Sequence, residues 1–316
     1  MDDYSLNNSL GFVFPGQGSQ KIGMLAELEK NHLVITETFN EASDVLSYDL
    51  WDLSQNGTKK DIMLTERTQP LLLTASVGIW RLWCQKGGDM PSLMAGHSLG
   101  EWSALVCSDV IRFDDAVELV RKRGAYMQKA VPVGDGAMAA IIGLDDKTIK
   151  SVCAASCNGQ EVAAVNFNSP GQVVIAGNAE AVNRAMKNCK EAGAKRVLPI
   201  PVSAPFHTNL MKPAAEQLCE DMNKIKFRSP RIPIVHNVNA KTESDPEIIK
   251  KLMIEQIFKP VLWVDCVNVM ADMNVSHIVE CGAGKVLGGL CKRIDSSFKV
   301  HSTEDVSSLN LALPGL

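Results

Sequence analysis

Ser98 lies at the centre of a Gly-x-Ser-x-Gly pattern, between a short apolar run at 93–95 and a segment typical of a helix. In a sharp strand-to-helix turn the central side chain leaves the edge of the sheet and can act as a nucleophile, while the flanking glycines allow the tight backbone. The N–H of Leu99 would then lie near a helix N-terminus, where it can stabilise an oxyanion. An ordinary Gly/Ser turn is the alternative that this pattern leaves open.

Two histidines are candidates for the general base that such a serine needs. His207 ends the Pro-containing segment 203–207, at an expected junction between two structural units. Its ordinary pKa near neutrality suits proton transfer. His97 is nearer in sequence, but its side chain should leave the turn in a different direction from Ser98, so it is the weaker candidate. For any single histidine, a surface or core position without catalytic function is the alternative.

An arginine interrupts an otherwise small and apolar helical stripe. Arg123 shares this stripe with Ala116, Val120, Gly124 and Met127. Burying an arginine without a partner is costly, so its head either reaches solvent or awaits an acidic ligand. A planar guanidinium suits a carboxylate because two parallel N–H···O bonds can form.

Two glycine-containing loops could approach a ligand. In the segment 15–20, glycines on both sides of Gln17 let the backbone come close, although a flexible loop explains the composition equally well. The segment 280–285 has the glycine density of a phosphate loop. It fails the GxxxxGK[ST] spacing, and Val286 follows Lys285, so we predict a tight strand-to-helix turn there.

The elements that must position these residues form an α/β pattern. We predict buried strands at 11–14 and 93–95, a helix that begins at 68–70 and ends at 87–88, and a helix from Asp114, its expected cap, to about 129. The middle of the chain predicts a βαββαβ order, typical of a ferredoxin-like unit, with strands at 137–143, 162–166, 172–176 and 196–202 and helices at 145–156 and 179–192. We therefore expect a small subdomain at 132–204, inserted between two parts of a larger core at 1–131 and 205–316.

Composition narrows the class of protein. The 316 residues, with 46% hydrophobic and 22% charged residues, are typical of a globular protein with one large or two smaller domains. The net charge of −4 and the scattered basic residues do not favour nucleic-acid binding. The acidic, polar start does not resemble a signal or transit peptide, and we expect no membrane span. Nine cysteines without a CxxC pair and six dispersed histidines predict free, mostly buried thiols in a reducing cytosol and no metal cluster.

Taken together, these segments closely resemble the malonyl-CoA:acyl-carrier-protein transacylases of fatty acid synthesis and the related acyltransferase domains of polyketide synthases. The resemblance runs from the loop at 14–20 to the turn at 284–287, and the segments that carry it are 96–101, 123–128, 166–172, 205–207 and 256–261. It implies an α/β-hydrolase-like core with an inserted ferredoxin-like subdomain, in agreement with the division expected above.

The resemblance also implies a role for each matching residue. Ser98 would be the nucleophile that takes the malonyl group as an ester, and His207 would move the proton. The backbone N–H groups of Gln17 and Leu99 would form the oxyanion hole, and Arg123 would pair with the free carboxylate of malonate. The backbone carbonyl of Gln256 would orient His207, in place of the acid of a Ser-His-Asp triad. Acyl specificity is assigned to Phe206, whose position resembles the malonyl-selecting pattern, and to Met127.

The implied reaction converts thioester to ester and back to thioester, so we expect ping-pong kinetics and no cofactor or metal. The expected partners are malonyl-CoA and phosphopantetheinylated acyl carrier protein, and we expect a cytoplasmic monomer. A discrete polyketide-synthase malonyltransferase, a hydrolase of carrier-protein thioesters and a non-catalytic carrier-docking subunit remain as alternatives. One departure from the family stands out, because related chains commonly carry a glycine near Asp109. The tail after about Lys299 has no clear pattern and is expected to be loosely held.

Overall fold

A parallel sheet of five strands forms the centre of the larger unit. The structure, a computed structural model, describes residues 6–202 and 204–313, so Ser203 of the segment 203–207 lies outside the described residues. The strands lie in the order β7-β2-β1-β8-β9, and their bounds are β1 (Leu6–Phe14), β2 (Met90–Gly96), β7 (Ile234–Val235), β8 (His277–Glu280) and β9 (Lys299–Ser302). The runs expected at 11–14 and 93–95 are the carboxyl halves of β1 and β2. Loops that follow parallel strands open at one edge of the sheet, where ligands bind in such folds.

Alternate side chains of the central strands enter two separate cores. Leu10, Phe12 and Phe14 of β1 belong to one cluster of buried residues, whereas Val13 of β1 and Leu93 of β2 belong to another. This division follows from the period of two along a strand, which sends neighbouring side chains to opposite faces.

Helices supply the other half of each core. The first cluster includes residues of α1 (Ala26–Asn31), α2 (Leu33–Leu46), α3 (Leu50–Asn56), α4 (Lys59–Ile62), α5 (Thr65–Gln85), α6 (Leu99–Cys107), α7 (Phe113–Lys129), α10 (Lys212–Met222), α11 (Pro246–Glu255) and α14 (Val306–Ala312). The second includes residues of α12 (Trp263–Asp272) and α13 (Val286–Ile294). A short 3₁₀ turn, η1 (Asn209–Met211), precedes α10.

The second sheet is antiparallel and has four strands. Its elements are β3 (Gly136–Ile142), α8 (Asp146–Ser156), β4 (Val162–Ser169), β5 (Gln172–Asn178), α9 (Ala179–Glu191) and β6 (Arg196–Ile200), and the strand order is β4-β5-β3-β6. This order along the chain and across the sheet is that of a ferredoxin-like unit. The predicted fold class, an α/β-hydrolase-like core with a ferredoxin-like insert, is confirmed.

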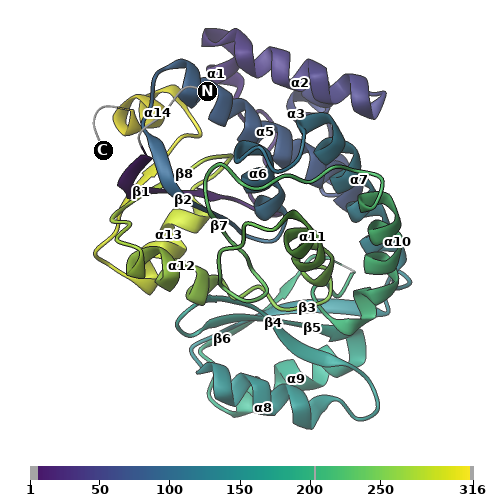
Figure 1. Ribbon diagram of the computed structural model, residues 1–316. Helices are drawn as coiled ribbons and strands as arrows, with labels where there is room; N and C mark the ends of the chain where they lie inside the picture. Colours follow the sequence, from purple (N-terminus) through teal and green to yellow (C-terminus); the bar gives the residue numbers. More distant parts are fainter. Residues whose placement is uncertain (1–5, 203, 314–316) are drawn as a thin grey trace.

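Backbone hydrogen bonds join the two units. The N–H of Phe167 in β4 donates to the carbonyl of Val261 at 3.0 Å, and the N–H of Val261 donates to the carbonyl of Val165 at 2.8 Å. In Figure 1 the antiparallel sheet lies below the larger unit, with α8 and α9 on its far side. The face of this sheet opposite α8 and α9 carries Met138 and Val174, which pack with Phe206 of the larger unit.

Three local expectations were wrong. The helix expected from 68–70 begins at Thr65, so Pro70 lies inside α5, where only the carbonyl one turn earlier loses its helical donor. The helix expected to be capped by Asp114 begins at Phe113, and Asp114 instead accepts hydrogen bonds from the Arg112 side chain. The tail expected to be loosely held forms β9 and α14, because β9 adds a parallel strand beside β8 and a capping box at Asp305 starts the helix.

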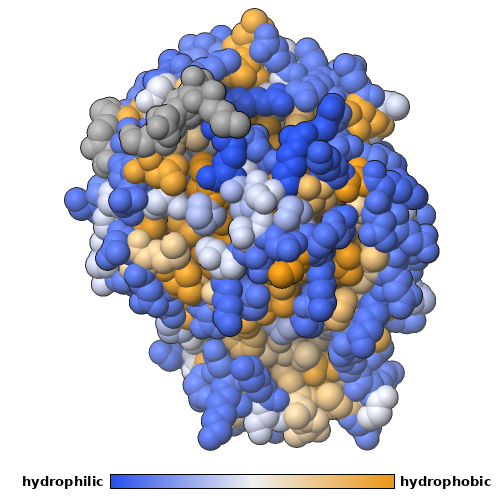
Figure 2. Space-filling view, viewed as in Figure 1, coloured by the Kyte–Doolittle hydropathy of each residue, from blue (hydrophilic) through white to orange (hydrophobic). Residues whose placement is uncertain are grey.

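Hydrophilic residues cover much of the face shown in Figure 2, and apolar residues gather near its middle and over the antiparallel sheet. Across residues 6–202 and 204–313, no helix is both long and apolar enough to cross a bilayer. All nine cysteines are free thiols and six of them are buried, which confirms the prediction of free, mostly buried thiols.

Candidate active site

The serine lies on a sharp turn between β2 and α6, the elbow at residues 96–100. β2 ends at Gly96 and α6 begins at Leu99, and between them Ser98 adopts φ 53° and ψ −105°. A Cβ at Gly96 would collide with the backbone of Gly100, and a Cβ at Gly100 would collide with the carbonyl of Phe14. Both glycines of the pattern are therefore required by close backbone approaches, which hold the serine in an unfavourable conformation.

His207 lies 109 residues after Ser98 in the sequence but contacts it in the structure. Its Nε2 lies 2.8 Å from Ser98 Oγ, and its Nδ1 lies 2.7 Å from the backbone carbonyl of Gln256. Gln256 follows the last residue of α11, so its carbonyl has no helical donor and can accept from the ring. A carbonyl can only accept, so the proton of a neutral ring resides on Nδ1 and Nε2 is free to accept a proton from the serine. Burial, and secondly the charge of Arg123, lower the pKa of His207 to about 3.

Arg123 is buried beside the serine, on the face of α7 that turns toward the core, with only 2% of its surface exposed. Its Nη1 donates to Gln69 Oε1 at 2.8 Å, and its Nη2 donates to Gln256 Oε1 at 3.0 Å and to Ser98 Oγ at 3.2 Å. Burial lowers its pKa to about 10, so the guanidinium still carries its charge at neutral pH. The structure thus holds a buried cation against neutral acceptors beside Ser98.

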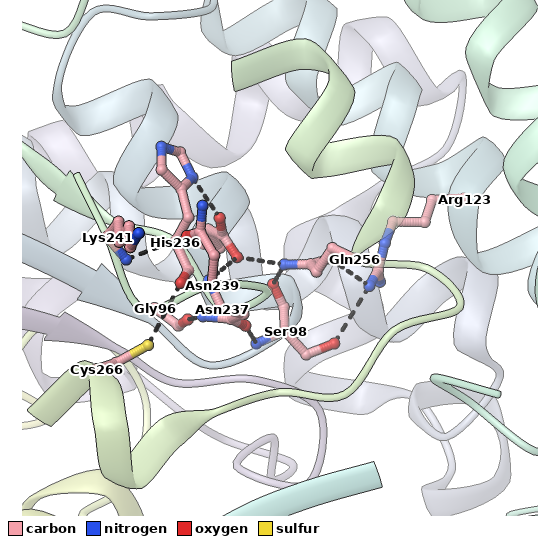
Figure 3. A network of polar contacts seen from close by, with 10 residues as sticks. Gly96, Ser98, Arg123, His236, Asn237, Asn239, Lys241, Gln256 and Cys266 are labelled. Atoms are coloured by element: carbon pink, nitrogen blue, oxygen red, sulfur yellow. Dashed lines mark hydrogen bonds and ion pairs between the residues drawn. The ribbon is translucent and has the colours of Figure 1, made fainter. Parts of the chain in front are cut away.

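A cavity of about 130 Å³ opens at these groups. Seven residues predicted from the sequence line it: Gln17, Ser98, Leu99, Arg123, Met127, Phe206 and His207. The eighth, Gln256, reaches Arg123 and Ser98 through its side chain (Figure 3). The structure therefore brings all eight predicted residues together.

The two backbone groups predicted to form the oxyanion hole come from the start of α6 and from the loop after β1. Leu99 is the first residue of α6, so its N–H precedes the helical hydrogen bonds and points out of the helix N-terminus. The loop of Gln17 follows β1, and a Cβ at Gly16 would collide with the carbonyl of His97. This close approach explains the glycine and brings Gln17 to the wall of the cavity.

The side chain of His97 contacts Asn168 rather than Ser98. Its Nε2 lies 2.8 Å from Asn168 Oδ1 of β4, and burial lowers its pKa. His97 therefore links the elbow to the antiparallel sheet, while His207 contacts the serine.

Four polar residues of the site were not predicted from the sequence. Gln69 binds Arg123, Asn237 Oδ1 accepts the N–H of Ser98 at 2.7 Å, and Glu101 binds the side chain of Gln256. The fourth, Asn166, lines the cavity. Glu101 stands among small and apolar residues, which is the sequence signal of a buried polar group that needs a partner. Gln69 carries no such signal, because it follows the polar run 65–68.

The segment 280–285 is the tight strand-to-helix turn that its spacing predicts. β8 ends at Glu280 and α13 begins at Val286. The Glu280 carboxylate accepts hydrogen bonds from the N–H groups of Leu287 at 3.1 Å and Gly288 at 2.7 Å. The chain's own carboxylate thus occupies the position that a phosphate takes at other helix N-termini.

Comparison with known proteins finds relatives along nearly the whole chain. The family model described as acyl transferase domain matches residues 11–292. The malonyl CoA-acyl carrier protein transacylase of Salmonella typhimurium is 55% identical over 302 residues, which cover 96% of this chain and 98% of that protein. A crystal structure of an acyl carrier protein S-malonyltransferase from Vibrio cholerae matches with a TM-score of 0.94 and 53% identity, covering 96% of this chain and 99% of that one. A malonyl-transacylase in complex with its type II polyketide-synthase acyl-carrier protein matches with a TM-score of 0.96 and 52% identity, again over 96% and 99%.

Proposed function

The chain belongs to the acyl transferase domain family, and on this premise we propose that Ser98 carries a malonyl group from malonyl-CoA to the thiol of an acyl carrier protein. Relatives that match nearly the whole chain carry the name malonyl CoA-acyl carrier protein transacylase, which supports this activity. The observation that carries the proposal is the buried guanidinium of Arg123, 3.2 Å from the serine oxygen. A cation in that position suits an acyl group that ends in a carboxylate.

The first half-reaction forms a malonyl ester. His207 Nε2 accepts the proton of Ser98 as the serine oxygen attacks the thioester carbonyl. The negative charge that develops on the carbonyl oxygen is stabilised by the N–H groups of Leu99 and Gln17. As the carbon–sulfur bond breaks, His207 gives the proton to the thiolate of coenzyme A.

The second half-reaction reverses these steps with a new thiol. The phosphopantetheine thiol of the carrier protein gives its proton to His207 and attacks the ester carbonyl. The bond to Ser98 Oγ breaks, and the serine takes the proton back from His207. Because the acyl group moves from thioester to ester to thioester at one serine, the kinetics are ping-pong, and water must be kept from the ester.

Arg123 selects the acyl group. The malonyl carboxylate can take two parallel hydrogen bonds from the guanidinium, replacing the weak contact to Ser98 Oγ. An acetyl group leaves the buried cation with only neutral acceptors, a penalty on the order of 2–5 kcal/mol for a desolvated charge pair. Met127 and Phe206 line the same cavity and limit its width around the acyl chain.

We also propose where the enzyme acts and which pathway it supplies. The enzyme acts as a cytoplasmic monomer that supplies malonyl units for fatty acid synthesis, with residues 1–131 and 205–316 as catalytic core and 132–204 as the small subdomain. One matching structure pairs a malonyl-transacylase with a polyketide carrier protein, which favours polyketide synthesis as a second candidate pathway. Transfer rates to a fatty-acid carrier and a polyketide carrier, measured side by side, distinguish the two.

Covalent trapping tests the nucleophile. The protein is mixed with malonyl-CoA, quenched in acid and weighed intact by mass spectrometry. The unaltered chain should gain one malonyl group, and Ser98→Ala should gain none, because no other hydroxyl lies against His207 Nε2 in the described residues. Ser103→Ala, which removes a buried hydroxyl from the same helix α6, should be acylated normally. A malonyl group that persists on Ser98→Ala would exclude Ser98 as the nucleophile.

A further inference from the structure

We propose that Glu101 is a positioning residue for acyl selection, because its carboxylate fixes the side-chain amide of Gln256 in the orientation that holds Arg123. This inference rests on the proposed function, in which Arg123 recognises the malonyl carboxylate. It assigns a role to a buried acid that takes no part in the proton transfers described above.

Glu101 is fully buried and surrounded by donors. It is the third residue of α6, and its exposed fraction is 0%. Its Oε1 lies 2.7 Å from His236 Nδ1, while its Oε2 accepts hydrogen bonds from Gln256 Nε2 at 2.6 Å and from the N–H of Asn237 at 3.2 Å. A carboxylate that accepts hydrogen bonds on both oxygens in this way is an acceptor-only group, and any neighbour must present a donor to it.

The Gln256 side chain bonds both to this carboxylate and to the Arg123 guanidinium. Figure 3 shows its hydrogen bonds with Ser98 and Arg123. Its Nε2 donates to Glu101 and also to the backbone carbonyl of Ser98 at 2.9 Å. Its Oε1 is thereby left to accept from Arg123 Nη2 at 3.0 Å. A flipped amide would place its oxygen against the carboxylate and its NH₂ against the guanidinium, which are two repulsive contacts.

The orientation of the Gln256 amide matters because Arg123 makes no salt bridge within residues 6–202 and 204–313. Its three acceptors are neutral, and Gln256 supplies one of them. Glu101 is also the charged group that raises the pKa of Arg123 against the effect of burial. The neutral amide therefore links a buried anion to a buried cation while keeping the guanidinium free to meet the substrate carboxylate.

The Glu101 carboxylate is also connected to the elbow indirectly, through hydrogen bonds of Asn237. Asn237, whose N–H donates to Glu101, accepts the N–H of Ser98 at 2.7 Å and donates through Nδ2 to the carbonyl of Gly96 at 2.7 Å. A purely structural role would therefore lower all acyl transfers together. A role in orienting Arg123 would lower malonyl transfer selectively, and this difference makes the inference testable.

The test is a competition between malonyl-CoA and acetyl-CoA for the same enzyme, read as the ratio of malonyl-enzyme to acetyl-enzyme by intact mass. Glu101→Gln keeps the size of the side chain but can present either an oxygen or an NH₂ to Gln256. We expect the ratio to fall by about 10-fold, equivalent to about 1.4 kcal/mol of selectivity. The ratio does not depend on the folded fraction, since both substrates react with the same folded molecules.

Two further variants distinguish a role of Glu101 in orienting Gln256 from a role in packing alone. Glu101→Asp keeps a carboxylate but leaves more empty space than Glu101→Gln, so it should retain more selectivity if the charge orients Gln256 and be the worse variant if packing decides. Ser103→Ala, a buried change on the same helix with no bond to this network among the described residues, should keep the unaltered ratio.

A ratio in Glu101→Gln equal to that of the unaltered chain would overturn the inference. So would an Asp variant less selective than the Gln variant. Failure of the proposed function has a different signature, because the unaltered chain itself would then form no malonyl-enzyme.

Discussion

At the scale of single residues, the proposed function couples recognition of the substrate by Arg123 to the basicity of the His207 ring. Burial is the first cause of the low pKa of His207 and the charge of Arg123 is the second. In the proposed reaction, a malonyl carboxylate bound to Arg123 neutralises that charge, so the pKa of His207 rises when malonyl-CoA is bound. An acetyl group provides no such neutralisation.

This coupling predicts the pH dependence. Since the pKa of His207 lies near 3, kcat/KM for malonyl-CoA should show no acid limb from pH 7 down to about pH 5. Arg123→Ala removes the charge, so the pKa of His207 should rise and the acid limb, measured with acetyl-CoA by rapid quench, should move to higher pH. The same variant should lose malonyl transfer and gain in relative acetyl transfer. An acid limb that stays in place in Arg123→Ala would contradict the coupling.

Stability must be followed in the same experiment. Below pH 6.5, the ordinary pKa of histidine, the unfolded chain takes up a proton that folded His207 refuses. The unfolded state then binds more protons, so the free energy of unfolding falls as the pH falls toward 3. Circular dichroism at each pH therefore defines the range in which rates report on the folded enzyme.

At the scale of elements, the elbow depends on one helix, α6, and two strands, β1 and β2, whose backbones approach more closely than side chains allow. Gly100 of α6 lies against the carbonyl of Phe14 at the end of β1, and both groups are backbone, which cannot move aside. This contact holds the N-terminus of α6, and with it Ser98 and Leu99, against the sheet. The strained conformation of Ser98 persists because these contacts outweigh its cost.

Two glycine substitutions should therefore have opposite effects. Gly100→Ala should lower the free energy of unfolding by more than about 2 kcal/mol and abolish acylation, because the new methyl group collides with backbone. Gly289→Ala, on the exposed face of α13 with open space around it, should raise stability by about 1 kcal/mol through helix propensity. Urea denaturation measures both. Equal effects of the two variants would show that the close approach at Gly100 is not what holds the elbow.

The elbow was predictable from sequence because its residues are consecutive. Gly96, Ser98 and Gly100 meet one another through the local turn, and their spacing alone indicates it. The partners of Arg123 were not predictable in the same way, since Gln69 lies in α5 and Gln256 just after α11, and both meet Arg123 only in the folded chain. Here the resemblance to a family supplied the role of the Gln256 carbonyl, but not the contact of its side chain.

Short elements were missed for a related reason. β9 has four residues and is stabilised by pairing with β8, a partner that no local pattern reveals. Asp109, where related chains were expected to carry glycine, adopts φ 61°, so the turn keeps its left-handed backbone with a different residue. Asp is one of the few side chains that tolerate this conformation, which explains how the departure is accommodated.

At the scale of the whole molecule, the active site lies where two units meet. Leu262 and Val264 of the larger unit pack against the core beneath α8 and α9, and Phe206 packs against the opposite face of the antiparallel sheet. The backbone bonds between Val261 and β4 run along the same boundary. Residues of the antiparallel unit therefore share packing and hydrogen bonds with the unit that carries Ser98.

This shared boundary predicts that the two units unfold together. Differential scanning calorimetry should show one transition whose calorimetric and van't Hoff enthalpies agree. Ile149→Ala, which opens a cavity in the core of the small unit, should cost about 2–5 kcal/mol and move that single transition to lower temperature. If the units were energetically separate, the same variant would split off an early transition, and hydrogen exchange would locate it in residues 132–204.

Because Met138 and Phe206 line the cavity from the two sides of the boundary, such a split would also remove acylation before the larger unit melts. Acylation measured through the transition should instead fall in step with the heat signal.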